Sequence, residues 1–599
     1  MTAARQTLRR WIPGLDVALG YKRAWLWPDV RSGLVLTALL IPAGMGYAEA
    51  AGLPAYTGLY ATIVPLLAYA VFGPSKILVI GPDSSLAPII AAAILPLALG
   101  SEERTIALAG LLAIMVGLIL VLAGSLRLGF VTDLLSKPIR IGYLNGIAIV
   151  VIISQLPKLL GFSVDSLGPV RDIASIAEGI AGGEIDVPAA LLGVGAIVVI
   201  LVFRYVWGGR IPGVFVAVAG AMVVTAVFGL DRIVPVVGAM PQGLPTPALG
   251  EIKWADVVAL AAPAVGVALI AFADTGVLSR TLAARRGEKV SGSREMVGLG
   301  IANIAGGLFS GFPISASTSR TPVAEAAGAR SQFAGVVGAL LVLAFMVLIP
   351  GVTRFLPDSV LAAVVIMAVI GLIDFSGLIR LWKIDRWDAA LSIASSLGVL
   401  LVGVLAGILV SIGLSFIAFV VDSWRPYRTE LGRIPEVRGY HDRVRNPEAE
   451  RIPGVLILRW DARLFFANGG IFDDWVRSMV EKAAKDAEPG APAIHTVILA
   501  AEPITDIDTT AMDELVELDE YLTQRGIRLV LAEVKGPVRD IMRKHGLDTR
   551  FPPDRFPPTV GAAVDAETGS LRSDIGDVGD PADDETAEGP RDAQPPAGT

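Results

Sequence analysis

The feature that most constrains this fold is a series of long apolar segments in which charged residues are rare or missing. Stretches such as 190–203 and 340–349 contain no charged residue at all. A helix needs about 20 apolar residues to cross a hydrocarbon core about 30 Å thick. Most of the segments reach that length, so the chain is predicted to be a polytopic α-helical membrane protein. Fourteen segments are expected, at 31–50, 55–72, 83–99, 104–125, 138–160, 187–206, 211–229, 254–280, 293–310, 317–329, 331–350, 358–375, 387–404 and 405–422.

Composition excludes several other classes of protein. Of the 599 residues 53% are hydrophobic and 18% charged, whereas a soluble chain carries about 25% charged residues. Cysteine is absent, which excludes disulfides, zinc-thiolate sites and iron–sulfur sites. The three histidines all follow residue 424, so no histidine metal site is expected in the membrane. No nucleotide loop, metal cluster or nucleophile constellation is present, so neither an enzyme nor a cofactor is predicted.

The distribution of lysine and arginine predicts the orientation of the segments. These residues concentrate before the first segment and after even-numbered ones, as at Lys137, Arg204 and Arg380, while odd-numbered loops hold at most two. Basic loops stay in the cytoplasm. Both termini are therefore expected in the cytoplasm, with the chain in a bacterial inner membrane. Residues 1–30 have no apolar core, and we expect no cleavable signal peptide there.

Two of the apolar segments are interrupted, and their spacing indicates an internal repeat. Glycine and proline precede short helix candidates in ILVIGPDSSLAP (77–88) and GGLFSGFPISASTSR (306–320), about 230 residues apart. Other pairs of segments repeat at about 225 residues. Seven segments per repeat is an odd number, so the second copy is predicted to be inverted. Paired interruptions at matching positions indicate a transport site near the bilayer midplane.

Hydroxyl groups and one arginine gather at the two interruptions. Ser84 and Ser85 lie at the first, and Ser317, Ser319 and Arg320 at the second. A half-helix N-terminus presents unpaired N–H groups and a positive partial charge, which suit an anion. A charge at membrane depth is a functional hypothesis by default. We therefore predict a small-anion site here. The alternative is that the serines only cap helices and that Arg320 caps its helix or extends to the cytoplasm.

Four acidic residues are predicted at membrane depth. Asp274 lies well inside an apolar run and could carry a proton or bind a cation, or it could form a structural ion pair with Arg320. Asp83 at the anion site would repel a dianion unless it points away as a helix cap or is protonated during transport. Glu49 and Glu325 lie near segment ends, where a partner in a loop or helix end is expected. Asp274, Glu49 and Asp83 are the candidates for proton coupling.

Past residue 430 the pattern changes to that of a small cytosolic α/β domain. Strands are expected within 455–466, 495–505 and 527–534, and helices at 508–526 and 537–546. From about residue 563 the chain is acidic with few large apolar side chains, which predicts a disordered tail. Residues 565–599 carry a net charge of −8 and residues 1–564 sum to +1, so the overall −7 says nothing about a substrate. The predicted organisation is 1–30 cytoplasmic, 31–424 transmembrane, 430–562 cytosolic and 563–599 disordered.

Three motifs resemble those of a known family. IPAGMGYAEAAGLPAYTGLYA (41–61) is similar to the first signature of the sulfate permease (SulP) anion transporters, and 299–335 resembles their span 9–10 signature with its Ser-Arg pair. VILAAEPITDIDTTAMDEL (497–515) resembles a STAS domain. The resemblance implies core and gate domains, an elevator-like alternation and a homodimer. The site residues it implies are Tyr47, Ser84, Ser85, Ser319, Arg320 and, at the acidic position of span 8, Asp274.

The resemblance also brings departures and a candidate regulatory residue. Leu278 stands where sodium-coupled members carry threonine, so a coupling proton is favoured over sodium. Thr509 matches a position that is phosphorylated in bacterial anti-sigma antagonists. A phosphate at a helix N-terminus is electrostatically favourable. The alternative is an ordinary helix cap by Asp508.

These observations predict a secondary anion transporter, coupled to protons and embedded in the lipid bilayer, with no nucleic-acid partner and no metal. Sulfate is the first candidate substrate, and a C4-dicarboxylate, bicarbonate or chloride are alternatives. A nucleobase permease would share the architecture, but the sequence SASTSR argues against it. A membrane-anchored STAS signalling protein is another alternative, although such a sensor would not need two matched broken helices.

Overall fold

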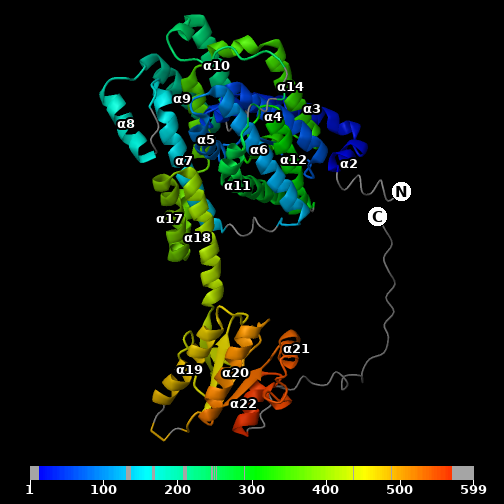
Figure 1. Ribbon diagram of the computed structural model, residues 1–599, viewed down its shortest axis with the longest axis vertical. Helices are drawn as coiled ribbons and strands as arrows, with labels where there is room; N and C mark the ends of the chain where they lie inside the picture. Colours follow the sequence, from blue (N-terminus) through cyan, green and yellow to red (C-terminus); the bar gives the residue numbers. More distant parts are fainter. Residues whose placement is uncertain are drawn as a thin grey trace, which may run out of the picture. The chain divides into compact units, whose positions relative to one another are not determined.

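The computed structural model describes residues 12–569, except for 130–135, 165–168, 207–211, 244–246, 248–249, 251, 289, 436, 487–488 and 491. Within it the chain divides into two compact units, residues 1–416 and 417–599. The first is helical and the second combines helices with a sheet (Figure 1). The predicted disordered tail lies outside the described residues from 570 onward.

Each of the fourteen predicted segments contains a helix. Seven helical stretches in the described part of the chain are long and apolar enough to cross a membrane, and others, such as α5 and α14, are shorter. The predicted polytopic helical fold is therefore confirmed. In chain order the helices are α3 (Leu26–Ala50), α4 (Ala55–Phe72), α5 (Ala87–Ala98), α6 (Glu102–Ser125), α7 (Lys137–Leu160), α9 (Val187–Tyr205), α10 (Gly213–Phe228), α11 (Trp254–Arg286), α12 (Gly292–Leu308), α13 (Arg320–Ala326), α14 (Phe333–Leu348), α15 (Asp358–Ile370), α17 (Arg386–Val402) and α18 (Val404–Trp424).

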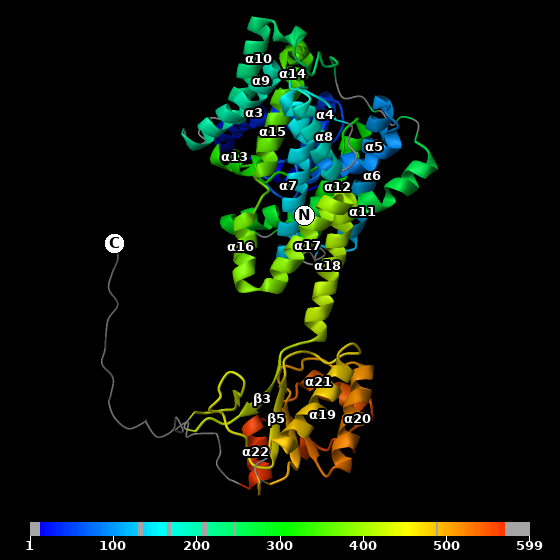
Figure 2. The same ribbon diagram turned by 90° about the vertical axis from the view of Figure 1, so that its left-hand side faces the viewer.

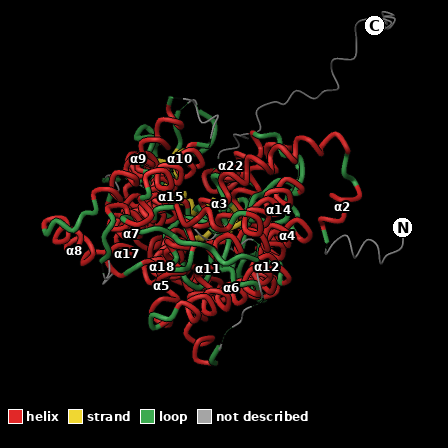
Figure 3. The backbone as a smooth tube through the Cα atoms, turned by 90° about the horizontal axis from the view of Figure 1, so that it is seen from above, coloured by secondary structure: helices red, strands yellow, loops and turns green. Residues whose placement is uncertain are grey.

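The packing of these helices follows the predicted inverted repeat. In the first group α14 packs on α3 and α4, and the equivalent α6 packs on α11 and α12. Figure 3, looking down on the helical unit, shows α3, α4 and α14 side by side. In the second group α7 packs on α17, and the equivalent α15 packs on α9. The first group, α3–α6 with α11–α14, corresponds to the predicted core, and the second to the predicted gate.

Glycines allow the close contact between α6 and α12. A Cβ atom at Gly117 would lie 2.5 Å from the carbonyl oxygen of Gly300, and one at Gly110 would lie 2.8 Å from that of Gly307. Small residues let membrane helices approach until their backbones touch. Because the two pairs are seven residues apart on both helices, they form one continuous stripe that fixes α6 against α12.

Among the described residues of the first unit, three further α-helices lie outside the predicted segments, apart from the first residue of α16. They are α2 (Pro13–Leu19), α8 (Pro169–Ala181) and α16 (Phe375–Ile384). The helices α8 and α16 occupy equivalent loops of the two repeats, after α7 and after α15. Both are short and amphipathic, and α16 exposes Phe375, Ile379 and Trp382 while Leu381 is buried. The sequence interpretation placed residues 376–386 in the loop after the segment 358–375 and predicted no helix there.

The second unit is built on a five-stranded sheet in the order β4-β3-β5-β6-β7. The central strands β5, β6 and β7 are parallel, and β3 is antiparallel to β5. Helices α19 and α20 cover one face and α22 the other (Figure 2). The elements are β3 (Arg428–Gly432), β4 (His441–Asp442), β5 (Val455–Trp460), α19 (Gly469–Lys485), β6 (Thr496–Ala500), α20 (Thr509–Gln524), β7 (Arg528–Ala532), α21 (Gly536–Lys544) and α22 (Val560–Thr568).

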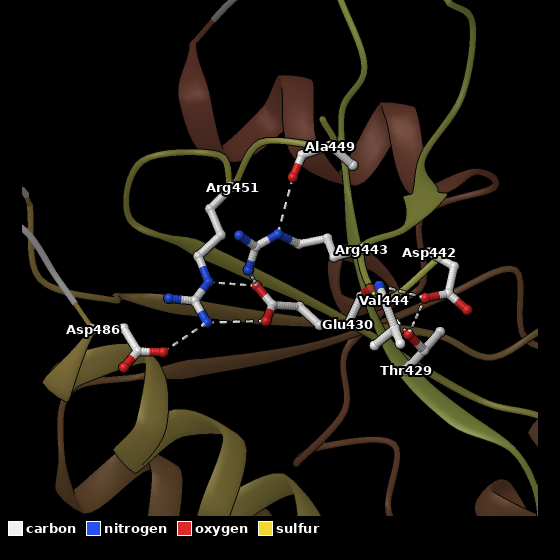
Figure 4. Close-up of polar contacts among 8 residues, drawn as sticks. All are labelled: Thr429, Glu430, Asp442, Arg443, Val444, Ala449, Arg451 and Asp486. Carbon is white, nitrogen blue, oxygen red and sulfur yellow. Dashed lines mark hydrogen bonds and ion pairs between the residues drawn. The ribbon is translucent and has the colours of Figure 1, made fainter. Parts of the chain in front are cut away.

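A buried carboxylate holds the edge of this sheet together. Glu430 on β3 is 7% exposed and accepts hydrogen bonds from Arg443 at 2.8 Å and from Arg451, which also pairs with Asp486 at 3.8 Å (Figure 4). Hydrogen bonding to Glu430 raises the pKa of the Arg451 guanidinium above its ordinary value. One carboxylate therefore anchors two arginines from the loop that follows β4.

Replacing Glu430 by glutamine is expected to destabilise this unit by about 2 kcal/mol, because both arginines lose a charged acceptor. Hydrogen exchange of the full chain should show faster exchange in peptides covering β3 and β5. Glu520→Gln is the matched control, since Glu520 pairs with Arg550 at 2.8 Å at an exposed position. Equal effects of the two substitutions would contradict this role of Glu430.

Candidate functional site

Two short antiparallel strands bring the interrupted segments together. β1 (Ile80–Gly81) pairs with β2 (Ser315–Ala316), with Gly81 opposite Ser315. After β1 the chain turns into the short helix α5, and after β2 it turns into the short helix α13. The Ser317 N–H donates to the carbonyl of Val79 at 2.9 Å, which extends the pairing. The loop 82–86 and the loop 317–319 therefore lie next to each other.

The helices begin later than the sequence pattern predicts. The predicted segments start at residues 83 and 317, whereas α5 starts at Ala87 and α13 at Arg320. Ser84, Ser85, Ser317 and Ser319 consequently lie in the turns before the helices. Because α13 has only seven residues, its dipole is small, and the charge of the Arg320 side chain dominates the local field.

A cavity of about 450 Å³ opens beside the two turns. Its polar lining comes from both helix groups. The core contributes Tyr47, Asp83, Ser84, Ser319 and Arg320, and the gate contributes Arg204 together with apolar side chains of α9, α10 and α15. Five of the predicted site residues thus meet in one place although they come from three separate segments.

Arg320 is the most unusual residue in this cavity. It is 2% exposed, and its Nη2 donates to the carbonyl oxygen of Pro82. Its Nε and Nη1 atoms are buried without a hydrogen-bond partner in the described part of the chain. The ring of Tyr47 lies 6.0 Å from the guanidinium carbon. A buried donor without an acceptor costs about 1–3 kcal/mol, and more when it is charged, so these two nitrogens are ready for an anionic acceptor.

A second polar group lies directly behind the cavity. Ser85 Oγ is 2.9 Å from Asp83 Oδ2 and 3.0 Å from Asp274 Oδ2, and the Ser85 N–H donates to Asp83 Oδ2 at 3.1 Å. Asp83 therefore closes its own turn and still lines the cavity. Asp274 contacts Ser85 and forms no ion pair with Arg320 within the described part of the chain.

The remaining predicted residues take supporting or separate positions. Ser317 is fully buried and accepts a hydrogen bond from the Arg320 N–H at 3.2 Å, as a helix cap does. Glu49 does not line the cavity and interacts electrostatically with Lys158 and Asp358. Glu325 pairs with Arg286 at 3.6 Å, as a helix-end residue was expected to.

In the second unit, Asp508 caps α20 by accepting the Ala511 N–H at 2.9 Å. Thr509, next to it, is exposed. The cap uses the Asp508 carboxylate and not the Thr509 hydroxyl. Phosphorylation of Thr509 stays a prediction.

The sequence interpretation missed three polar contributors to the site among the described residues, namely Pro82, Arg204 and Thr318, of which Arg204 and Thr318 line the cavity. Pro82 supplies the carbonyl that holds Arg320, and proline in this turn was read only as a helix interruption. Arg204 lines the cavity from α9, and it was counted only as a cytoplasmic loop charge. Arg204 lies at the end of α9, which is not one of the two interrupted segments, so its sequence position gave no indication of a site.

Gly81 is required where β1 passes Arg320. Its φ of +151° is strained for other residues, and a Cβ would lie 3.3 Å from Arg320 Nη1. If the predicted anion binds here, Gly81→Ala should raise the KM for its uptake about tenfold, as expected when moving Arg320 weakens binding by about 1–2 kcal/mol. Gly100→Ala is the control, because Gly100 has φ +80° with nothing within 4 Å. Equal KM values for the two variants would contradict this.

Comparison with known proteins agrees with this architecture. Residues 26–395 match the sulfate permease family and residues 446–563 match the STAS domain. A protein named probable sulfate transporter from Mycobacterium tuberculosis is 38% identical over 557 residues, which cover 93% of this chain and 98% of that protein. Sulfate transporter 4.1, chloroplastic, of Arabidopsis thaliana is 30% identical over 91% of this chain and 81% of its own length.

Solved structures share the fold. The structure of SLC26A9 superposes with a TM-score of 0.85 at 22% identity and covers 95% of this chain and 94% of its own. The transmembrane domain of the cyanobacterial bicarbonate transporter BicA gives a TM-score of 0.56 at 21% identity, over 66% of this chain and 98% of its own. The chain is thus a multi-pass membrane protein that belongs to the sulfate permease family and carries a C-terminal STAS domain.

Proposed function

We propose that this protein is a secondary transporter of a small inorganic anion, with sulfate as the first candidate. The observation that carries the proposal is the pair of buried nitrogens on Arg320 that have no partner in the described part of the chain, on a residue that lines a cavity together with Ser84 and Ser319. A tetrahedral oxyanion supplies acceptors in several directions at once. Its oxygens can accept from Nε, from Nη1 and from a hydroxyl without leaving any of them unpaired.

The names of the relatives support sulfate over other anions. Both relatives described above are named sulfate transporters. A C4-dicarboxylate, bicarbonate or chloride remain the alternatives, because the same donors suit any of these anions. The 450 Å³ cavity is large enough for each of them, so charge is expected to separate the dianions, sulfate and a C4-dicarboxylate, from bicarbonate and chloride.

Proton coupling is supported by a count of hydrogens at Ser85. The Ser85 hydroxyl has one hydrogen and contacts a carboxylate oxygen on each side, on Asp83 and on Asp274. It can donate to only one of them, and the other contact is a hydrogen bond only when that carboxyl carries a proton. Two ionised carboxylates sharing this hydroxyl would also repel each other. We infer that the pair holds one proton, and that a proton on Asp83 removes its repulsion toward a bound dianion.

An elevator motion is the mechanism we propose for exposing the site to each side in turn. Tyr47 is on core helix α3, and the opposite wall of the cavity is formed by gate helices α9, α10 and α15. Gly46 of α3 packs against Val365 of α15, where a Cβ would lie 3.1 Å from the valine side chain. A small residue packed against an apolar side chain at this boundary suits sliding of one group past the other. We also propose that the protein forms a homodimer and that both of its termini lie in the cytoplasm.

Uptake of radiolabelled anions into proteoliposomes tests the function. Sulfate, fumarate and bicarbonate would each be assayed with and without inward proton and sodium gradients. We expect sulfate uptake that a proton gradient stimulates and a sodium gradient does not. Uptake of fumarate or bicarbonate in place of sulfate would make that anion the substrate. Uptake of none would contradict a transport function for all three.

A further inference from the structure

Arg204 lines the same cavity as Arg320 but belongs to the opposite helix group. It lies in the last turn of gate helix α9, whereas Arg320 begins core helix α13. Arg320 is buried and held by Pro82, but Arg204 is exposed. The contact recorded for its guanidinium within the described residues is the Tyr205 ring, 5.7 Å away. A long side chain in that position can reach toward the cavity without a change in the backbone.

The charges around the cavity give this arginine a specific role. Among the described lining residues three side chains are charged, namely Asp83, Arg204 and Arg320. With Asp83 ionised they sum to +1, and with Asp83 protonated they sum to +2. Without Arg204 the same two states sum to 0 and +1. The positive charge that balances a dianion is therefore present only when Arg204 is counted.

We propose that Arg204 is a second anion contact, supplied by the gate, that sets the preference for divalent over monovalent anions. This inference rests on the proposed anion site at Arg320. A monovalent anion is balanced by Arg320 with a protonated Asp83 and does not need Arg204. The simpler role for Arg204 is that of a cytoplasmic topology residue facing lipid headgroups. That role predicts no dependence on substrate charge.

The test uses the full-length protein in proteoliposomes with three variants, Arg204→Gln, Arg204→Lys and the control Arg380→Gln. Arg380 is an exposed arginine on α16, in another loop of the gate, and does not line the cavity. The KM and kcat for labelled sulfate are measured, and the Ki of unlabelled chloride as a competitor. Thermal unfolding of each purified variant verifies that the fold is retained.

Arg204→Gln is expected to raise the KM for sulfate about tenfold while the Ki of chloride changes by less than about twofold. Arg204→Lys should restore most of the loss, because it keeps the charge. The difference from the parent should shrink at high ionic strength, since Arg204 is exposed. Arg380→Gln should match the parent protein.

An unchanged sulfate KM in Arg204→Gln, or equal changes for sulfate and chloride, would overturn this inference. That outcome differs from failure of the proposed function. If the parent protein transports sulfate and Arg320 variants do not, but Arg204→Gln is silent, only the role of Arg204 is lost. If the parent transports no sulfate, or if Arg320 variants remain active, the proposed site itself is wrong and the inference fails with it.

Discussion

Replacing Arg320 by glutamine is expected to lower kcat/KM for sulfate by about thirtyfold or more. Glutamine can still donate to the Pro82 carbonyl, but it removes the positive charge and the two nitrogens that have no other partner. Losing a charged partner inside a binding site costs about 2–5 kcal/mol, and each 1.4 kcal/mol is a factor of ten. Initial rates of labelled sulfate uptake in proteoliposomes measure the effect.

Two further substitutions separate the charge of Arg320 from its geometry. Arg320→Lys keeps the charge but loses the planar array of donors, so we expect it to lie between the parent and the glutamine variant. Arg330→Gln is the control, because Arg330 is an exposed arginine only ten residues later that does not line the cavity. Sulfate uptake by Arg320→Gln at the parent rate would remove Arg320 from the site.

Replacing Asp274 by asparagine is expected to abolish the stimulation of uptake by an inward proton gradient. Asparagine keeps a hydrogen bond to Ser85 and nearly the same volume, so the fold should be retained. It cannot gain or lose a proton, and the Asp83–Ser85–Asp274 group then loses one of its two titrating members. The measurement is the rate of sulfate uptake with the proton gradient divided by the rate without it. In Asp274→Asn this ratio should lie within about a factor of two of 1.

Variants of the other acids show which carboxyl matters. Asp83→Asn resembles the protonated carboxyl, so sulfate binding should persist while its dependence on pH weakens. Glu49→Gln should keep the proton stimulation, because Glu49 faces Lys158 and Asp358 and not the cavity. Undiminished stimulation in Asp274→Asn would contradict a role for this residue in coupling, whatever the other two variants do.

The membrane part of the fold was predictable because length and polarity alone define a spanning helix. All fourteen predicted segments contain helices, and the repeat spacing anticipated which helices pack in equivalent pairs. The starts of α5 and α13 were not predictable from the same pattern. The serines before them continue the apolar segment in sequence, but β1 and β2 pair first, and the turns that contain these serines follow before each helix begins.

The second unit shows where local patterns fail. The strands β5, β6 and β7 and the helix α20 lie within their predicted ranges, and α21 begins one residue before its predicted range. Helix α19 was not predicted, although it covers one face of the sheet with Phe472 and Val476. Helix α22 runs to Thr568, past residue 562 where the domain was predicted to end, since Val560 and Val564 pack on the other face of the sheet. Such tertiary contacts are not visible in a short acidic stretch of sequence.

The candidate site was predicted to different degrees for different residues. Arg320, Ser319, Ser84, Asp83 and Tyr47 do line one cavity. Their convergence depends on the crossing of two segments about 230 residues apart, which only the repeat suggested. The bridging position of Ser85 and the presence of Arg204 in the cavity wall could not be predicted, because both depend on which side chains of other helices face the turn.

The most direct test of this account is a structure of the protein with selenate, a sulfate analogue whose selenium gives an anomalous signal. The account predicts one selenium site in the cavity, with selenate oxygens within hydrogen-bond distance of Arg320 Nε and Nη1 and of a serine hydroxyl from Ser84 or Ser319. Selenate bound elsewhere in the helical unit, with the Arg320 nitrogens still unpartnered in a protein that transports sulfate, would contradict it.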